Sequence, residues 1–311
     1  MKKIIVAVSG GVDSVVMLHQ LVQQGAGVRG RVSAALTPIP NPQPPKLIVT
    51  HIDHGLRSDS PADARFVAAL TECYGLEFEQ TRLELGDRSE AAARTRRWQF
   101  LQEVKEKYQA DAIATAHHRD DVIETMIINL LRGTNRNGLT SLRARSGILR
   151  PLLSYSKQDI YSYAIENNLE WAEDSTNCSD QYLRNRIRHY LVPALSSEQR
   201  DIFLKIYDNL IQTNQELNRS LKQAAQTLAT RQADRFRIET QHINQLPDSI
   251  QRELFATWWQ QLMGSPPPDS LQLERMVAAI GEPKTGNRYQ MANGVRLKIN
   301  RGDFELLVND D

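Results

Sequence analysis

A glycine-rich hexapeptide is the first place where residue types and spacing indicate chemistry. It consists of Ser9, Gly10, Gly11, Val12, Asp13 and Ser14, and it follows an apolar run at residues 3–8 that is typical of a strand buried on both faces. Two glycines let the backbone turn sharply, and the next helix would offer unpaired N–H groups to an anion. The string is not the lysine-containing phosphate loop. It predicts either a phosphate site or a plain turn in which Asp13 or Ser14 caps the helix.

Two further strings bring histidines and arginines to the ends of predicted elements. His51, Asp53 and His54 follow a second apolar run, but no third ligand has a spacing that supports a metal site. Arg94 and Arg97 are three positions apart in a predicted helix, so they share a face. They indicate either contacts with phosphate or a solvated basic surface.

A third string carries the carboxylates. His117 and His118 end a short apolar run, and Asp121 and Glu124 follow on one face of the next predicted helix. The two carboxylates could hold Mg²⁺ or orient a nucleophile, whereas helix capping is the alternative, above all for Asp120. Further on, arginines recur at alternate positions that suit either RNA phosphates or solvent: Arg184, Arg186 and Arg188.

Strands and helices that alternate along the first half must position these groups. Strands are predicted at residues 3–8, 47–52, 76–83 and 111–116, and helices at 14–24, 62–74, 90–108 and 120–132. Repeated units of this kind predict a parallel sheet that binds ligands at the carboxyl ends of its strands. The Pro-rich residues 25–46 predict a long exposed loop.

The second half loses this alternation. Helices are predicted at residues 156–167, 185–195, 196–231 and 250–262, and an Asn-Gly turn predicts a hairpin of residues 288–291 and 295–299. A chain of 311 residues suggests two domains. We expect a catalytic domain at 1–195, and a long linking helix with a C-terminal domain at 196–311.

Composition limits the classes of protein that remain. The 38 basic and 37 acidic residues give a formal charge of +1, so a nucleic-acid partner has to be argued from local patches. The two cysteines, Cys73 and Cys178, form no CxxC pair. No apolar run is long enough for a membrane span or a signal peptide, so we expect a cytoplasmic protein without a membrane partner.

The strings together resemble one family. Residues 9–14 resemble the pyrophosphate loop of the N-type ATP pyrophosphatases, or PP-loop superfamily. With HIDHGLR at 51–57, EAAARTRRW at 90–98 and HHRDDVIETMIINLLRG at 117–133, the chain resembles tRNA(Ile)-lysidine synthetase over about residues 1–195. The resemblance implies an α/β, parallel-sheet, adenine nucleotide α-hydrolase-like (Rossmann-like) catalytic domain. A smaller, mainly helical C-terminal domain that binds tRNA would follow it.

The resemblance also implies an activity. The family joins free L-lysine to C2 of the wobble cytidine of the CAU-anticodon tRNA(Ile), through an adenylated cytidine, and so changes codon reading from AUG to AUA. ATP and Mg²⁺ are the implied cofactors, and a homodimer is an assembly that the sequence leaves open. Lysine must attack as the neutral amine. With the ordinary lysine pKa of ~10.4, that form is roughly 10⁻³ of the total at pH 7.

Roles for the candidate residues follow from the resemblance. The hexapeptide would cradle pyrophosphate, with Asp13 near the Mg²⁺-bound phosphates, and Arg97 would steady the charge that develops during adenylation. Asp121 and Glu124 would position cytidine, lysine or both, and His117 and His118 are the alternatives for taking the proton from lysine. The remaining expected contacts are His51, Asp53, His54 and Arg94 with ATP, and Arg184, Arg186 and Arg188 with the RNA.

Three other functions stay open from the sequence. A tRNA cytidine thiolase of the same superfamily would use similar ATP chemistry, but such enzymes commonly use paired cysteines. A non-RNA ATP pyrophosphatase would make little use of the arginine clusters. A nucleotide sensor without catalysis would not need Asp13 together with the Asp121 and Glu124 pair.

Overall fold

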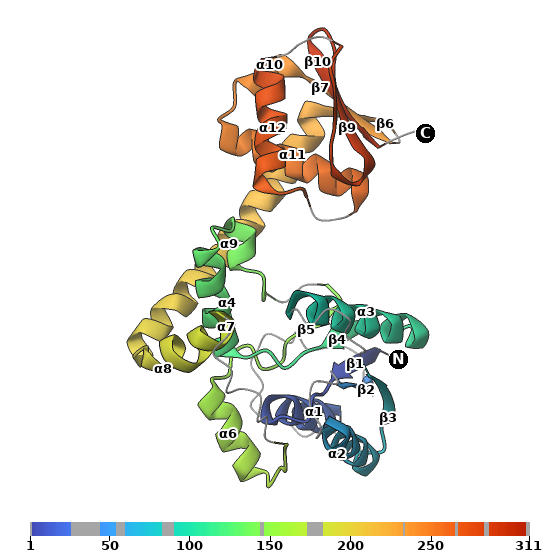
Figure 1. Cartoon of the computed structure of the whole chain (residues 1–311), viewed down its shortest axis with the longest axis vertical. Coiled ribbons are helices and arrows are strands. Elements are labelled where there is room, and N and C mark those ends of the chain that lie inside the picture. The colour runs from blue at the N-terminus through green and yellow to red at the C-terminus, as the bar shows by residue number, and fades with distance from the viewer. Residues whose placement is uncertain are drawn as a thin grey trace. The chain divides into compact units, whose positions relative to one another are not determined.

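The structure is a computed structural model of the whole chain. It describes residues 2–25, 44–53, 60–82, 90–143, 146–172, 183–232, 234–264, 267–282 and 286–308. The chain forms two compact units, Met1–Leu210 and Ile211–Asp311, and helix α9 (Ser197–Leu228) belongs to both (Figure 1). His54 and most of the Pro-rich segment lie outside the described residues. The boundary expected at 195/196 falls at the start of α9, whereas the two units divide within this helix.

The first unit is built on a parallel sheet, as predicted. Its strands are β1 (Lys3–Ala7), β2 (Lys46–Asp53), β3 (Glu77–Arg82), β4 (Ala112–Ala114) and β5 (Ile148–Leu149), in the order β3-β2-β1-β4-β5. The sequence did not predict β5. After β1 the chain moves outward through β2 to β3 and then returns to β4 on the other side of β1. Ligands of such sheets bind at this reversal, beyond the carboxyl ends of the strands.

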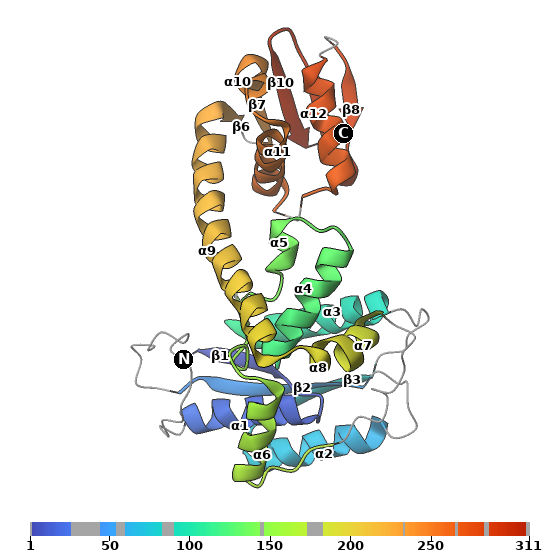
Figure 2. The same cartoon turned by 90° about the vertical axis from the view of Figure 1, so that its left-hand side faces the viewer.

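Alternate side chains of the strands enter two different cores. Ile4 and Val6 of β1 pack with helices α1 (Val12–Gly25), α2 (Ser60–Cys73) and α6 (Lys157–Glu166), whereas Ile5 packs with α3 (Glu90–Tyr108). The helices therefore cover both faces of the sheet (Figure 2). Burial on both faces explains why these strands are continuous apolar runs.

Helix α4 (Arg119–Leu131) has an apolar side that is covered by later segments. Its Ile123, Ile127 and Ile128 pack against the π-helix η2 (Ile187–Leu191), α8 (Val192–Ala194) and the start of α9. Helix α7 (Leu183–Arg186) lies next to α4 as well. Phe203 and Leu204 are the residues that α9 contributes to this cluster. The beginning of α9 therefore completes the core of the first unit. A short helix, α5 (Arg136–Leu139), follows α4.

The second unit joins helices to an antiparallel sheet. Its strands are β6 (Ala229–Gln232), β7 (Arg235–Glu239), β8 (Arg288–Gln290), β9 (Val295–Ile299) and β10 (Asp303–Val308), in the order β6-β7-β10-β9-β8. Helices α10 (Thr240–Asn244), α11 (Asp248–Met263) and α12 (Ser270–Gly281) pack with the inner side of the sheet around Phe255, Trp258 and Phe304. The unit is mostly helical and contains the predicted hairpin, β8 and β9. The other three strands were not predicted.

None of the helices in the described part of the chain combines the length and apolar character that a membrane span requires.

Candidate active site

Ser14 organises the glycine-rich loop between β1 and α1. Its Oγ accepts the N–H groups of Ser9 at 3.1 Å and Gly10 at 3.2 Å and donates to the carbonyl of Gly11 at 2.8 Å. Gly10 has φ +97°, a conformation that side-chain-bearing residues rarely adopt. The first N–H groups of α1 have no partner within the helix, and Gly11, Val12 and Asp13 line a cavity. The loop is therefore folded around a position that suits an anion.

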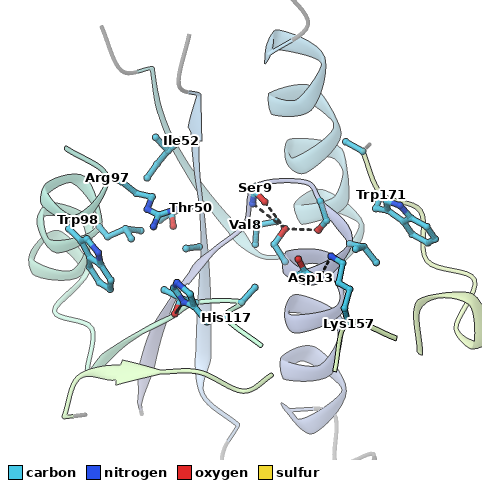
Figure 3. Close-up of a pocket in the computed structure, with 18 of the residues that line it drawn as sticks. Val8, Ser9, Asp13, Thr50, Ile52, Arg97, Trp98, His117, Lys157 and Trp171 are labelled. Carbon is cyan, nitrogen blue, oxygen red and sulfur yellow. Dashed lines mark hydrogen bonds and ion pairs between the residues drawn. The ribbon is translucent and has the colours of Figure 1, made fainter. Parts of the chain in front are cut away.

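The cavity has a volume of about 590 Å³ and lies at the carboxyl ends of the central strands. Ser9 follows β1, Thr50 and Ile52 lie on β2, and His117 follows β4. Figure 3 shows Arg97 and Trp98 across the cavity from Asp13 and Lys157, with His117 between them in this view. Cationic, acidic, aromatic and hydroxyl groups thus face one space.

Asp13 is paired with a lysine that the sequence analysis did not select. Lys157, the first residue of α6, places its Nζ 2.6 Å from Asp13 Oδ1. On the other side of Asp13, the Nε2 of His118 is 3.9 Å from Oδ2. The Asp13 carboxylate therefore lies between the ammonium of Lys157 and the imidazole of His118.

The predicted carboxylates and two of the predicted RNA-binding arginines meet in one cluster. Arg188 donates from Nη2 to Asp121 at 2.9 Å and from Nε to Glu124 at 2.7 Å, and Arg184 donates to the other oxygen of Glu124. Asp121 is 8% and Glu124 2% exposed. Asp121 and Glu124 are three positions apart, so they lie on one side of α4. Arg184 of α7 and Arg188 of η2 are four positions apart in consecutive helical segments, so they also lie on one side. Of these four residues only Arg188 lines the cavity, so the two carboxylates it binds lie behind this part of the wall.

Asp121 and Arg188 favour each other's ionised form. Burial raises the pKa of Asp121, but His118, Arg188, His117 and the backbone N–H of His118 together lower this pKa below its ordinary value. Burial lowers the pKa of Arg188, and the carboxylates of Glu124 and Asp121 outweigh it, so the pKa rises. An Asp121 that stays ionised and paired with a guanidinium is a weak proton acceptor but a good binding group for a cation.

The two histidines have different positions. His118 is the N-cap of α4. Its ring Nδ1 accepts the backbone N–H of Asp120 at 3.3 Å, and its backbone N–H donates to the carboxylate of Asp121 at 2.9 Å. His117 lines the cavity, with Nδ1 3.0 Å from Thr115 Oγ1. Burial, opposed by Asp121 and reinforced by nearby arginines, lowers the pKa of His117 to about 4. Its imidazole is therefore neutral at pH 7.

Other predicted residues lie outside the cavity wall. His51 is buried and its Nδ1 is 2.9 Å from the carbonyl oxygen of Val8, so it braces the strand before the loop. Asp53, at the end of β2, has Oδ2 3.7 Å from Arg82 Nε. Arg94 and Arg186 are exposed on α3 and α7.

The cavity also contains residues that sequence reasoning missed. They are Thr50, Trp98, Lys157, Tyr161 and Trp171. A lone lysine at a helix start or a single tryptophan has no spacing signal in the sequence. Lys157, for example, is identified only by its pairing with Asp13, which is 144 residues earlier in the chain.

The comparisons with known proteins agree with this architecture. A family model described as the PP-loop domain matches residues 1–195. The chain is 39% identical over 198 residues to a protein of Exiguobacterium sibiricum named tRNA(Ile)-lysidine synthase, covering 62% of the chain and 43% of that protein. It is 35% identical over 266 residues to the tRNA(Ile)-lysidine synthase of Bacillus subtilis, covering 80% of the chain and 53% of the relative. The chain thus spans about half the length of these relatives.

Among solved structures, the U34-tRNA thiolase NcsA of Methanococcus maripaludis has a TM-score of 0.51 at 17% identity, covering 68% of this chain and 72% of that one. This likeness shows a shared fold. A PP-loop domain implies the use of ATP. The loop, the parallel sheet and the match over residues 1–195 show that the chain belongs to the PP-loop domain family.

Proposed function

We propose that the chain joins free L-lysine to the wobble cytidine of a CAU-anticodon tRNA(Ile), with ATP split to AMP and pyrophosphate. The similarity to proteins named tRNA(Ile)-lysidine synthase supports the choice of substrates. One structural observation carries the reaction type. The phosphate loop and Arg188, which is bound by Asp121 and Glu124, line the same cavity, so ATP and a cationic second substrate can meet there.

In the first step, O2 of cytosine attacks the α-phosphorus of ATP and pyrophosphate leaves. The loop would bind the pyrophosphate portion, and Arg97 would face the charge that develops on the α-phosphoryl group. The described residues hold no cluster of three or more His, Cys, Asp or Glu that could bind a metal ion. A Mg²⁺ carried in by ATP would fit this site, with Asp13 and the Ser9 hydroxyl as its oxygen donors. Bound there, Mg²⁺ would neutralise phosphate charge.

In the second step, the neutral ε-amine of lysine attacks C2 and AMP leaves. Asp121 and Glu124 would bind lysine in its cationic form, with Arg188 shifting away as the ammonium arrives. Before the attack the ammonium has to lose a proton, and the neutral imidazole of His117, which lines the same cavity, would accept it and pass it to solvent. Cytidine has to leave its stack to reach the cavity.

The C-terminal unit would contact the tRNA backbone. On the outer face of its sheet, register places Gln232, Arg235, Leu307, Arg296 and Gln290 in one row across all five strands. The adjacent row contains Arg237, Lys298 and Arg288, with Glu305 between the first two. The first row itself has two arginines and no carboxylate, although Asp234, next to Arg235, has Oδ1 3.4 Å from its Nε; two arginines in one row suit a phosphate backbone.

Assembly and location are further parts of the proposal. The ATP and tRNA substrates favour the cytoplasm, and a homodimer is an assembly that light scattering of the purified chain would test.

The decisive experiment measures pyrophosphate release and AMP formation with and without free lysine and a CAU-anticodon tRNA(Ile) transcript. Lysine-dependent formation of AMP and a lysidine-containing tRNA is expected. Turnover that needs a sulfur donor would favour the thiolase, and turnover without tRNA would favour an ATP pyrophosphatase for a small metabolite. ATP binding without any turnover would favour a sensor.

A further inference from the structure

Hydrogen bonds at the start of helix α6 fix the backbone position of Lys157. Ser156 caps α6, and the N–H of Lys157 donates to Asp120 Oδ2 at 3.1 Å. The side chain crosses Tyr161, with Nζ 5.0 Å from the ring centroid, and ends 2.6 Å from Asp13 Oδ1. The backbone of Lys157 is thus fixed by α4, and its ammonium is held at the phosphate loop by Asp13 of α1 and Tyr161 of α6.

The same segment contacts the loop a second time. The N–H of Ala172 donates to the carbonyl of Gly10 at 3.0 Å, and Ala172 lines the cavity. Residues 157–172 therefore contact the loop at two points: Lys157 binds Asp13, and Ala172 binds Gly10.

The phosphate loop supplies no cationic side chain of its own. Residues 9–14 contain no basic side chain, and Asp13 adds a negative charge beside the position that suits phosphate. An ammonium has three donors, so Lys157 can bind Asp13 and phosphate oxygens together. Its side chain is 37% exposed and lines the cavity, which leaves it accessible to a ligand.

We propose that Lys157 is a further catalytic residue that binds the β- and γ-phosphates of ATP. When the bond from the α-phosphorus to the bridging oxygen breaks, the electron pair leaves with pyrophosphate, and the ammonium stabilises that charge. Lys157 would do the work of a phosphate-loop lysine from a different element of the fold. The proposal rests on the proposed function only in that ATP is split between its α- and β-phosphates.

Calorimetric titration of the full chain with inorganic pyrophosphate, ATP and AMP tests this role without tRNA or lysine. Lys157→Gln should weaken pyrophosphate and ATP binding about 10- to 100-fold, the range for a lost charge-assisted hydrogen bond, and leave AMP binding within about twofold. Lys157→Arg should recover most of the pyrophosphate affinity. Lys107→Gln is the matched control, because Lys107 is also 2.6 Å from a carboxylate, that of Glu79, and does not line the cavity.

Two results would overturn the proposal. Pyrophosphate affinity in Lys157→Gln within twofold of the unsubstituted chain would remove Lys157 from the phosphate site. Equal losses for pyrophosphate and AMP, with a lower unfolding temperature than Lys107→Gln, would assign it a structural role in holding the loop. Failure of lysine-dependent turnover would refute the proposed function and leave these binding results unaffected.

Discussion

Asp121→Asn separates the chemistry of the carboxylate cluster from its contribution to stability. The substitution keeps the shape of the side chain and an acceptor for the N–H of His118, but removes the charge that faces Arg188 at 2.9 Å. Lysidine formation should slow at least 10²-fold, as expected for a positioned acid–base or cation-binding group. That factor corresponds to about 2.7 kcal/mol of transition-state stabilisation.

The expected loss of stability is smaller. Removing one partner of a fully buried ion pair costs about 3–5 kcal/mol. Here Arg188 keeps Glu124 as a partner and its side chain is 43% exposed, so solvent screens the remaining charge. We expect a loss of about 1–2 kcal/mol, which lowers the unfolding midpoint by several degrees.

Asp120→Asn provides the matched control. Asp120 neighbours Asp121, is 2.9 Å from Arg200, and has a side chain that is 16% exposed against 10% for Asp121. Neither carboxylate lines the cavity itself, but Asp121 binds Arg188, which does, whereas Asp120 binds Arg200, which does not. Asparagine at position 120 keeps an acceptor for the N–H of Lys157. Single-turnover lysidine formation and thermal unfolding should be measured for both variants. Equal slowing in the two variants, or slowing in neither, would refute the role given to Asp121.

The remaining predictions concern the loop, the cavity histidine and the second unit. Asp13→Ala should abolish tRNA-dependent pyrophosphate release, and the variant should stay folded because the Asp13 side chain contributes little to the core. His117 binds protons less readily when folded, so stability should fall as pH drops from 6.5 towards 4, and His117→Gln should flatten this loss. Changing Arg235 and Arg296 to Gln should reduce the slope of log K against log salt for tRNA binding by up to about 2. A chain ending after Leu210 should still bind ATP and should bind tRNA less tightly.

Each of these predictions has a contrary outcome. Normal release kinetics in folded Asp13→Ala would remove the loop from the mechanism, and parallel stability curves for His117→Gln and the unsubstituted chain would mean that this imidazole is not buried as described. An unchanged salt slope in the arginine variant, checked against Arg288→Gln on the adjacent row, would move the RNA surface elsewhere. Equal tRNA affinity of the shortened and full chains would make the second unit structural.

The sequence predicted the elements that have a strong local pattern. Residues 90–108 were predicted as a helix and form α3 over that range. The two-residue β5 has no pattern to detect, because its pairing with β4 alone makes it a strand. Strand β6 is largely exposed and continues a polar helix, so nothing in its own residues distinguishes it from the last turn of α9. Its pairing with β7 decides its conformation.

The candidate site shows the same division between local pattern and partner. The sequence motifs predicted Asp13, Arg97 and His117 as site residues, and all three line the cavity. Asp13 lies in the first turn of α1 after β1, His117 follows β4, and Arg97 lies on α3, so a predicted element places each of them. Arg184 and Arg188 were selected as RNA contacts from charge alone, yet both donate to Glu124. The sequence shows that an arginine is positively charged, but it does not show which distant carboxylate the arginine binds.

The first two turns of α4 explain why these distant segments converge. Asp120 binds the start of α6 through the N–H of Lys157 and the start of α9 through Arg200. The adjacent Asp121, and Glu124 one turn further on, bind η2 through Arg188. Three carboxylates of one helix therefore hold the segments that supply Lys157 to the phosphate loop and Arg188 to the cavity wall. A truncation within the first turns of α9 would remove Arg200 and the apolar cover of α4, so a shortened chain has to keep α9 at least to Leu210 to test the second unit alone.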